Sequence, residues 1–151
     1  MENRVTRHPD SGRYGLVFHH LGLAVQAPEA AAAFLAGLGY AIGQRISDSS
    51  QRAGLIMCTH PGMPDVEIVF PDGGKGPLDG ILKRSGEGLY HTCYISRDVG
   101  TSIELMRKDG CRIVCVSPAQ PAVLFAGRKV SFYHVAGFGL MEILESGEEC
   151  P

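Results

Sequence analysis

The stretch Phe18-His19-His20-Leu21-Gly22-Leu23-Ala24-Val25 decides the fold, because the chain holds a second copy of it, Leu89-Tyr90-His91-Thr92-Cys93-Tyr94-Ile95-Ser96. Each copy is a short, mostly apolar run with a histidine near its start, followed by a helix-like segment that a glycine ends. The histidines and these glycines are both 71 residues apart (His20 and His91; Gly39 and Gly110). Landmarks held at one offset without a gap indicate an internal duplication, which determines the architecture.

The duplication also includes a carboxylate. The first half ends in the strand-like run 65–70, with Glu67 inside it, and the second half ends in 139–144, with Glu142. The two glutamates are 75 residues apart, so the second half needs only a small insertion. Either histidine alone would be read as an ordinary, partly buried residue, but buried unpaired glutamates on apolar strands are costly. One histidine and one glutamate from each half therefore predict a ligand set for one divalent metal ion.

The composition bounds the class of protein. At 151 residues, with 44% apolar and 20% charged residues, the chain fits one globular domain or two small modules that share a core. A net charge of −2 gives no basis for binding nucleic acid or an anionic membrane. The sequence shows no apolar run of about 18 residues and no signal-peptide pattern, which predicts a cytoplasmic protein. Five cysteines without a C-x-x-C pair indicate reduced thiols.

The first half reads as a β-α-β-β-β module over residues 16–70, after a polar lead-in at 1–15. The predicted elements are a strand at 16–25, a helix at 30–38 and strands at 40–46, 54–59 and 66–70. Because alternate residues of a strand share a face, His20, Gly22 and Ala24 should point one way. His19 should point the other way, as a structural or surface residue.

The second half, residues 89–145, repeats the pattern after a turn-rich linker at 71–88 that contains a short helix at 78–83. The predicted elements are a strand at 90–96, a helix at 99–109, a strand at 111–116, a proline-rich loop at 117–121 and strands at 123–126, 129–135 and 140–144. His91, Cys93 and Ile95 should share one face. Residues 146–151 form an acidic tail.

Four motifs resemble the vicinal oxygen chelate superfamily: H-L-G-L-A-V at 20–25, V-E-I-V-F-P-D-G at 66–73, Y-H-T-C-Y-I at 90–95 and G-L-M-E-I-L-E at 139–145. That superfamily includes glyoxalase I, methylmalonyl-CoA epimerase, extradiol dioxygenases, and fosfomycin- and bleomycin-resistance proteins. The resemblance covers about residues 17–145 and is closest to the branch that is epimerase-like and lactoylglutathione-lyase-like. It implies an α+β fold in which two βαβββ modules form a cupped, incompletely closed mixed sheet around one metal site.

The resemblance also implies the chemistry. The ligands would be His20, Glu67, His91 and Glu142, holding Ni, Co, Mn, Zn or Fe(II). The metal would act as a Lewis acid on a small substrate with a carbonyl or adjacent oxygens, and the enediolate formed by loss of the neighbouring proton would be metal-bound. Glu142 is the expected base and Glu67 its partner on the other side. The activity implied is that of an isomerase, an epimerase or a lyase.

Three further residues are candidates for substrate binding: Cys93 beside His91, and Arg128 and Tyr133 near the last strands. One departure is that the epimerases that this chain resembles carry an acid on the strand corresponding to 54–59, where this sequence has none. Their usual residue at position 67 is also Gln, whereas bacterial glyoxalase I resembles the His/Glu/His/Glu set.

Alternative functions follow from the same resemblance. One is glyoxalase I (lactoylglutathione lyase), and another, of a different class, is a metabolite- or antibiotic-binding resistance protein without catalysis. An extradiol dioxygenase ranks lower, because those proteins usually have longer chains and a 2-His-1-carboxylate set. A homodimer is expected, and the sequence leaves open whether the modules pair within one chain or across two.

Overall fold

The computed structural model describes residues 11–147. The strands are β1 Leu16–Ala24, β2 Ala41–Asp48, β3 Ala53–Thr59, β4 Asp65–Pro71, β5 Gly88–Ser96, β6 Ile113–Pro121, β7 Lys129–Val135 and β8 Gly139–Glu145. The helices are α1 Glu29–Gly37, α2 Pro77–Ser85, α3 Val99–Lys108 and the short 3-10 helix η1 Val123–Phe125. Parts of the predicted lead-in and tail, residues 1–10 and 148–151, lie outside the described residues.

The eight strands form one mixed sheet in the order β2-β3-β4-β1-β5-β8-β7-β6. The order is symmetric about the middle of the sheet: β5, β6, β7 and β8 occupy the places that β1, β2, β3 and β4 occupy in the other half. The duplication requires this symmetry. β1 and β5 pair antiparallel in the middle, and β4 and β8 pair parallel to them on either side. The expected α+β fold with a cupped, open sheet is confirmed, and both halves of a single chain build it.

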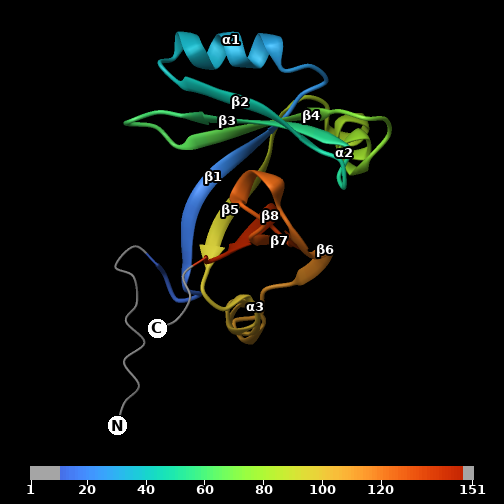
Figure 1. Cartoon of the computed structure of the whole chain (residues 1–151). Helices are drawn as coiled ribbons and strands as arrows, with labels where there is room; N and C mark the ends of the chain where they lie inside the picture. Colours follow the sequence, from blue (N-terminus) through green and yellow to red (C-terminus); the bar gives the residue numbers. More distant parts are fainter. Residues whose placement is uncertain (1–10, 148–151) are drawn as a thin grey trace.

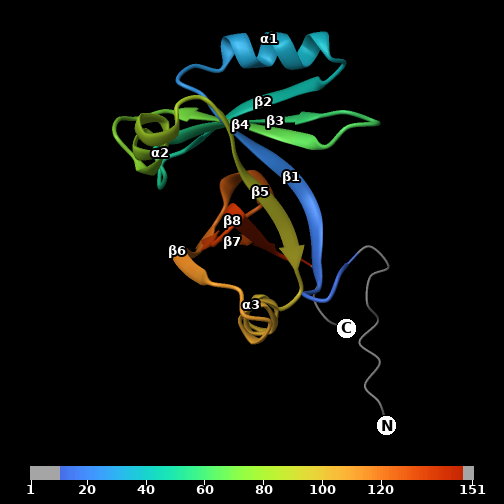
Figure 2. The same cartoon turned by 180° about the vertical axis from the view of Figure 1, so that it is seen from behind.

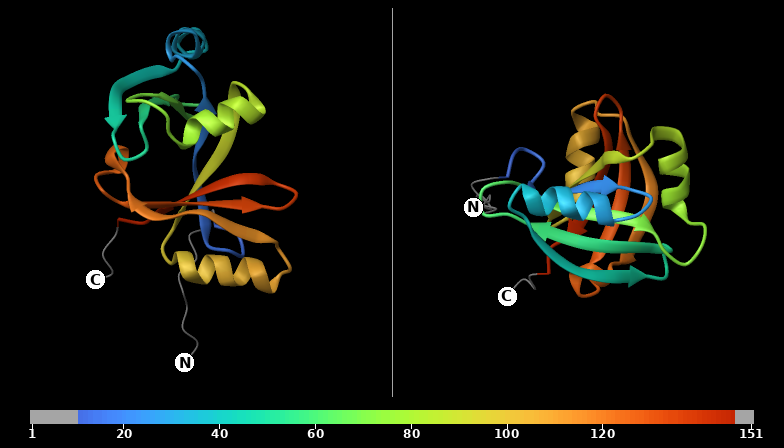
Figure 3. Two further views of the ribbon diagram at one scale, coloured as in Figure 1. Left: turned by 90° about the vertical axis from the view of Figure 1, so that its right-hand side faces the viewer. Right: turned by 90° about the horizontal axis from the view of Figure 1, so that it is seen from above.

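Each half of the sheet has an outer face covered by a helix. Figures 1 and 2 show α1 across β2 and β3 and α3 below β6 to β8, with β1 and β5 running between the halves. Leu35 of α1 packs on Ile56 and Ile68, and Met106 of α3 packs with Ile143. Since the helices occupy the outer faces, the inner faces of the two halves turn toward each other, as the left view of Figure 3 shows.

Local signals explain where these helices begin. Pro28 precedes α1 and Glu29 lies in its first turn, near the positive end of the helix dipole. The side chain of Asp98 caps α3 by accepting a hydrogen bond from the backbone N–H of Thr101 at 2.9 Å. In the described part of the chain, none of the helices has the length and apolar character of a membrane-spanning segment.

Two expected elements are wrong. The sequence pattern predicts a loop at 117–121, but β6 continues through it to Pro121. It predicts a strand at 123–126, but η1 forms the tip of the β6–β7 connection there. Ala126, with φ 55°, and Gly127, with φ 78°, turn the chain back toward β7. The run is apolar because it packs inside the cup: Leu124 packs near Leu55 and Val69, and Phe125 packs near Cys93.

Candidate metal centre

The four predicted ligands occupy two neighbouring rows across the middle of the sheet. In the first row, Gly22 of β1 lies between Glu67 of β4 and His91 of β5. In the second row, Cys93 of β5 lies between His20 of β1 and Glu142 of β8. The rows are two residues apart along each central strand, so all these side chains are on one face. The duplication therefore relates one row to the other, with a small residue at the centre of each.

The side-chain atoms of this cluster converge in the interior. Nε2 of His20 lies 3.3 Å from Nε2 of His91, 3.3 Å from Oε1 of Glu142 and 3.8 Å from Oε2 of Glu67. Nε2 of His91 is 3.6 Å from the same Oε1 of Glu142. All four residues are buried, with at most 4% of their surface exposed. The sequence prediction thus named residues that the fold brings together.

These residues fit a divalent ion. Donors that each lie about 2.1 Å from one tetrahedral ion are about 3.4 Å apart, close to the separations between these nitrogens and oxygens. His20, His91 and Glu142 form one group whose ligand atoms all lie within 4.8 Å of one another. Glu67 is not part of this group, although its Oε2 lies 3.8 Å from Nε2 of His20. Oε1 of Glu142 is buried and has no hydrogen-bond partner. A buried carboxylate oxygen without a hydrogen bond is costly in an apolar core, and a cation at this position would satisfy it.

Gly22 is required by the position of the His91 ring. A Cβ at residue 22 would lie 2.1 Å from Cε1 and 2.5 Å from Nε2 of His91. Contacts that short do not occur between non-bonded atoms, so only glycine allows this ring to lie across β1. The sequence marked Gly22 as part of the repeated motif, and the structure supplies the reason for it.

Burial and charge set the protonation of the cluster. Burial, followed by the charges of Glu142 and Asp48, raises the pKa of Glu67 well above the usual range of a glutamate. Burial would also raise the pKa of Glu142, but the adjacent rings of His20 and His91 outweigh it and lower that pKa. Burial lowers the pKa of His91 to about 4, against the opposing effect of Glu142. The His91 ring is therefore neutral at pH 7, which is the form that binds metals.

Two residues that the sequence analysis did not assign to the site lie beside it because of β-bulges. The pairing of β1 with β5 shifts register between Phe18 and His20 and again between Gly22 and Leu23, so His19 and Tyr90 have no direct partner. Each of them precedes a histidine of the cluster. Nδ1 of His19 lies 2.7 Å from Nδ1 of His20, and the Tyr90 ring contacts the His91 ring edge-on at 4.5 Å. His19, expected to be a structural or surface residue, is half-buried, and it contacts His20 because a bulge overrides the alternation of a regular strand.

The cluster is enclosed by aromatic rings. Phe125 of η1 stacks on His20, with ring centroids 5.7 Å apart, and meets His19 edge-on at 5.4 Å. Phe132 of β7, which pairs with Glu142, lies edge-on to His91 at 5.5 Å. Phe125 and Phe132 thus supply the apolar wall around the polar centre.

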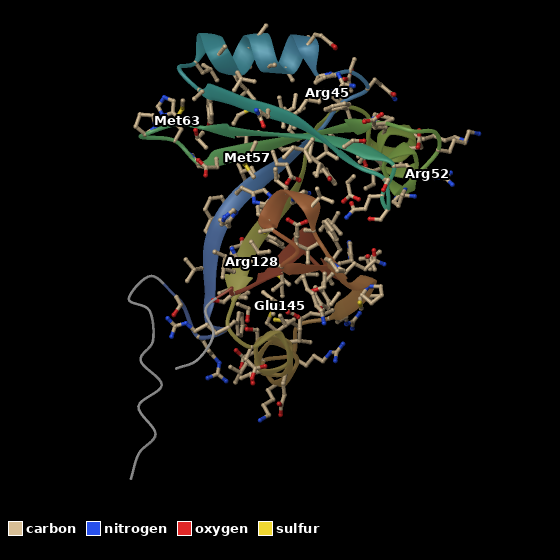
Figure 4. All side chains as sticks on the ribbon, in the orientation of Figure 1. Arg45, Arg52, Met57, Met63, Arg128 and Glu145 are labelled. Atoms are coloured by element: carbon tan, nitrogen blue, oxygen red, sulfur yellow. The ribbon has the colours of Figure 1, made fainter. Side chains whose placement is uncertain are left out.

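The three predicted substrate contacts lie in different places. Cys93 is fully buried beside Glu142, and burial raises the pKa of its thiol above the usual range. Arg128 donates from Nε to the backbone carbonyl of Glu145 at 3.0 Å, and the two residues lie close together in Figure 4. Tyr133 is on the outer face, in a groove beside α3 that Ile103 also lines. The structure does not bring Tyr133 to the site, because alternation puts its neighbour Phe132 on the inner face.

Loading the protein with zinc or cobalt(II) is expected to raise its melting temperature. An ion present at 100 times its Kd adds about 2.7 kcal/mol to the free energy of unfolding. For a domain of this size, that corresponds to a rise of roughly 5–10 °C. Differential scanning calorimetry with and without EDTA measures the effect, and His20→Ala serves as the control that should show no rise. A melting temperature that metal and chelator leave unchanged would contradict a metal centre here.

Comparison with known proteins identifies the family of this chain. A family model described as "Glyoxalase/Bleomycin resistance protein/Dioxygenase superfamily" matches residues 19–132. No curated protein matches the chain.

Three similar solved structures share the fold. A hypothetical protein from Bacillus halodurans C-125 has a TM-score of 0.74 at 21% identity, over 90% of this chain and 98% of the other. Methylmalonyl-CoA epimerase from Mycobacterium tuberculosis has a TM-score of 0.70 at 21% identity, over 87% and 88%. A Streptomyces coelicolor methylmalonyl-CoA epimerase in complex with 2-nitronate-propionyl-CoA has a TM-score of 0.66 at 21% identity, over 87% and 97%. At these identities the likeness is one of fold.

Proposed function

Because the chain belongs to the glyoxalase/bleomycin resistance protein/dioxygenase superfamily, we propose that it is a divalent-metal-dependent isomerase or epimerase. The reaction removes a proton from a carbon next to a substrate carbonyl. The observation that carries the proposal is the convergence of two histidines and two glutamates from the two halves in one buried cluster, with His20 Nε2 3.3 Å from Glu142 Oε1 and 3.8 Å from Glu67 Oε2. A purely structural core would not bury two carboxyl groups beside one imidazole nitrogen without partners for their oxygens.

The position of each residue assigns it a separate role in the reaction. A divalent cation held by His20, Glu67, His91 and Glu142 would supply Lewis-acid polarisation of the substrate carbonyl. Glu142 is the base that takes the proton, since the adjacent His20 and His91 rings outweigh burial, lower the pKa of Glu142 and so favour its ionised form. Glu67 comes from the opposite half of the pseudo-symmetric site and returns a proton on the other side. Phe125 and Phe132 exclude water around these groups, which strengthens their electrostatic effect.

The substrate class follows from the site and from the relatives. The cluster is enclosed by apolar rings, which favours a small molecule whose reactive end has a carbonyl or two adjacent oxygens. One structural relative is described as a complex with 2-nitronate-propionyl-CoA. This supports acyl thioesters as the first compounds to test, with 2-oxo compounds next.

Glyoxalase I remains the second candidate, because the four ligand-type residues are His, Glu, His and Glu, as in the bacterial enzymes that the sequence resembles. A binding protein for a metabolite or antibiotic is the candidate without catalysis. A homodimer in the cytoplasm remains a prediction from the sequence, and sedimentation equilibrium tests the dimer.

One experiment separates these functions. Cobalt(II)-loaded protein is incubated in D₂O with methylmalonyl-CoA, and deuterium at the α-carbon is measured by mass spectrometry. The proposal expects incorporation that EDTA abolishes. Turnover of the methylglyoxal–glutathione hemithioacetal instead would favour glyoxalase I. Neither reaction, together with chelator-insensitive binding of bleomycin, would favour a binding protein and contradict the enzyme.

A further inference from the structure

The two ligand histidines differ in the hydrogen bonding of Nδ1, the ring nitrogen that lies away from the cluster. Nδ1 of His20 lies 2.7 Å from Nδ1 of His19, which is hydrogen-bond distance. Nδ1 of His91 is buried without any hydrogen-bond partner. Ligand histidines usually donate this second N–H to an acceptor that sets their tautomer. Of the two, only His20 has such an acceptor.

We propose that His19 is a positioning residue for metal binding, whose ring accepts a hydrogen bond from His20 and so keeps the lone pair of His20 Nε2 directed at the cation. The inference rests on the proposed function, because this orientation matters only if the cluster holds a metal.

The tautomer of His20 determines the direction of this hydrogen bond. A neutral imidazole has one N–H and one lone pair, so a ring that offers Nε2 to a cation carries its proton on Nδ1. In His20 that proton points at Nδ1 of His19, which must then be the acceptor. His19 in turn carries its own proton on Nε2. The opposite arrangement, in which His19 donates, would leave the proton of His20 on Nε2, facing Glu142 at 3.3 Å and blocking a metal.

The bulge and η1 hold His19 in place for this role. The shift in register between Phe18 and His20 leaves His19 unpaired across β5, so its side chain turns toward its neighbour instead of the opposite face. Phe125 then packs edge-on against His19 and stacks on His20, so that one ring fixes the orientation of both histidines. His19 is half-buried and faces solvent on its other side, where its Nε2–H can be satisfied.

Two substitutions at residue 19 separate the effect of the hydrogen-bond acceptor from the effect of ring packing against Phe125. His19→Phe keeps an aromatic ring against Phe125 but removes the acceptor, whereas the side-chain amide oxygen of His19→Asn can accept near the position of Nδ1. Zinc affinity is measured by competition with a chromophoric chelator, and the melting temperature of each metal-free variant is recorded. We expect His19→Phe to bind zinc about 10- to 100-fold more weakly. His19→Asn should stay close to wild type.

Equal zinc affinity in all three proteins would overturn the inference, and so would an equal loss in both variants. Failure of the wild-type protein to bind zinc would contradict the proposed function as well, so the two failures are distinguishable.

Nuclear magnetic resonance of zinc-loaded, ¹⁵N-histidine-labelled wild type provides a test that needs no variant. We expect a proton on Nδ1 of His20 and a scalar coupling through the hydrogen bond to Nδ1 of His19. A His20 proton on Nε2, or a Nδ1 proton without that coupling, would overturn the inference even if His19→Phe failed to fold.

Discussion

Replacing Glu142 by glutamine is expected to slow solvent deuterium exchange into the substrate roughly a thousandfold, the scale on which a general base contributes. The amide has nearly the shape of the carboxylate but cannot take up a proton. The rate is measured by mass spectrometry at saturating cobalt(II), with bound metal quantified in the same samples. A variant that carries metal and exchanges within about tenfold of wild type would exclude Glu142 as the base.

Glu67→Gln is the matched control, since the duplication places Glu67 in the equivalent row of the other half. If Glu67 returns the proton on the opposite side, this variant should still exchange the substrate proton with solvent but lose inversion at the carbon. Chiral analysis of the recovered substrate separates exchange from inversion. An equal loss of both would mean that the two glutamates do not have the separate roles proposed here.

The substitution Gly22→Ala is expected to remove metal binding through sterics alone. The new methyl group would overlap the His91 ring, whose Cε1 would be 2.1 Å away, so the ring must leave the cluster. We expect zinc affinity to fall at least about 100-fold. The overpacked site should also lower the free energy of unfolding by about 1–3 kcal/mol. Isothermal titration and chemical denaturation measure the two effects.

Gly37→Ala is the control for that change. Gly37 ends α1, is exposed, and a Cβ there would meet nothing within 4 Å. Alanine favours the helix, so stability should be equal or higher by up to about 1 kcal/mol, with zinc affinity unchanged. Wild-type affinity in Gly22→Ala would show that the His91 ring is not needed where the structure places it.

The duplication made most of the fold predictable from the sequence. Two histidines at one offset and two glutamates at nearly the same offset define which strands must be central, and β1, β4, β5 and β8 are those strands. Alternation along β1 also predicted that His20, Gly22 and Ala24 share the buried face, which the structure confirms. The sequence therefore identified the residues that converge at the centre.

The surroundings of the centre were less predictable, for three physical reasons. A bulge adds one residue to a strand and changes which face it presents, and no residue type in Phe18-His19-His20 marks the bulge that brings His19 to His20. The second reason is the alternation of side chains along a strand. Tyr133 and Phe132 are adjacent, so one faces the site and the other faces the opposite side of the sheet, and an error of one residue exchanges them. The third reason is that apolar residues inside a cup and in a strand look alike in sequence, so the apolar run 123–126 predicts a strand where η1 lies.

The central claim is that the two halves of one chain hold one metal ion. Elemental mass spectrometry of protein purified without an affinity tag, with His91→Ala prepared in parallel, tests it most directly. We expect about one transition-metal ion per chain in the wild type and none in the variant, since that change removes one of the clustered ligands. A wild-type protein that stays free of metal after reconstitution, or a variant that retains as much metal as wild type, would contradict the account.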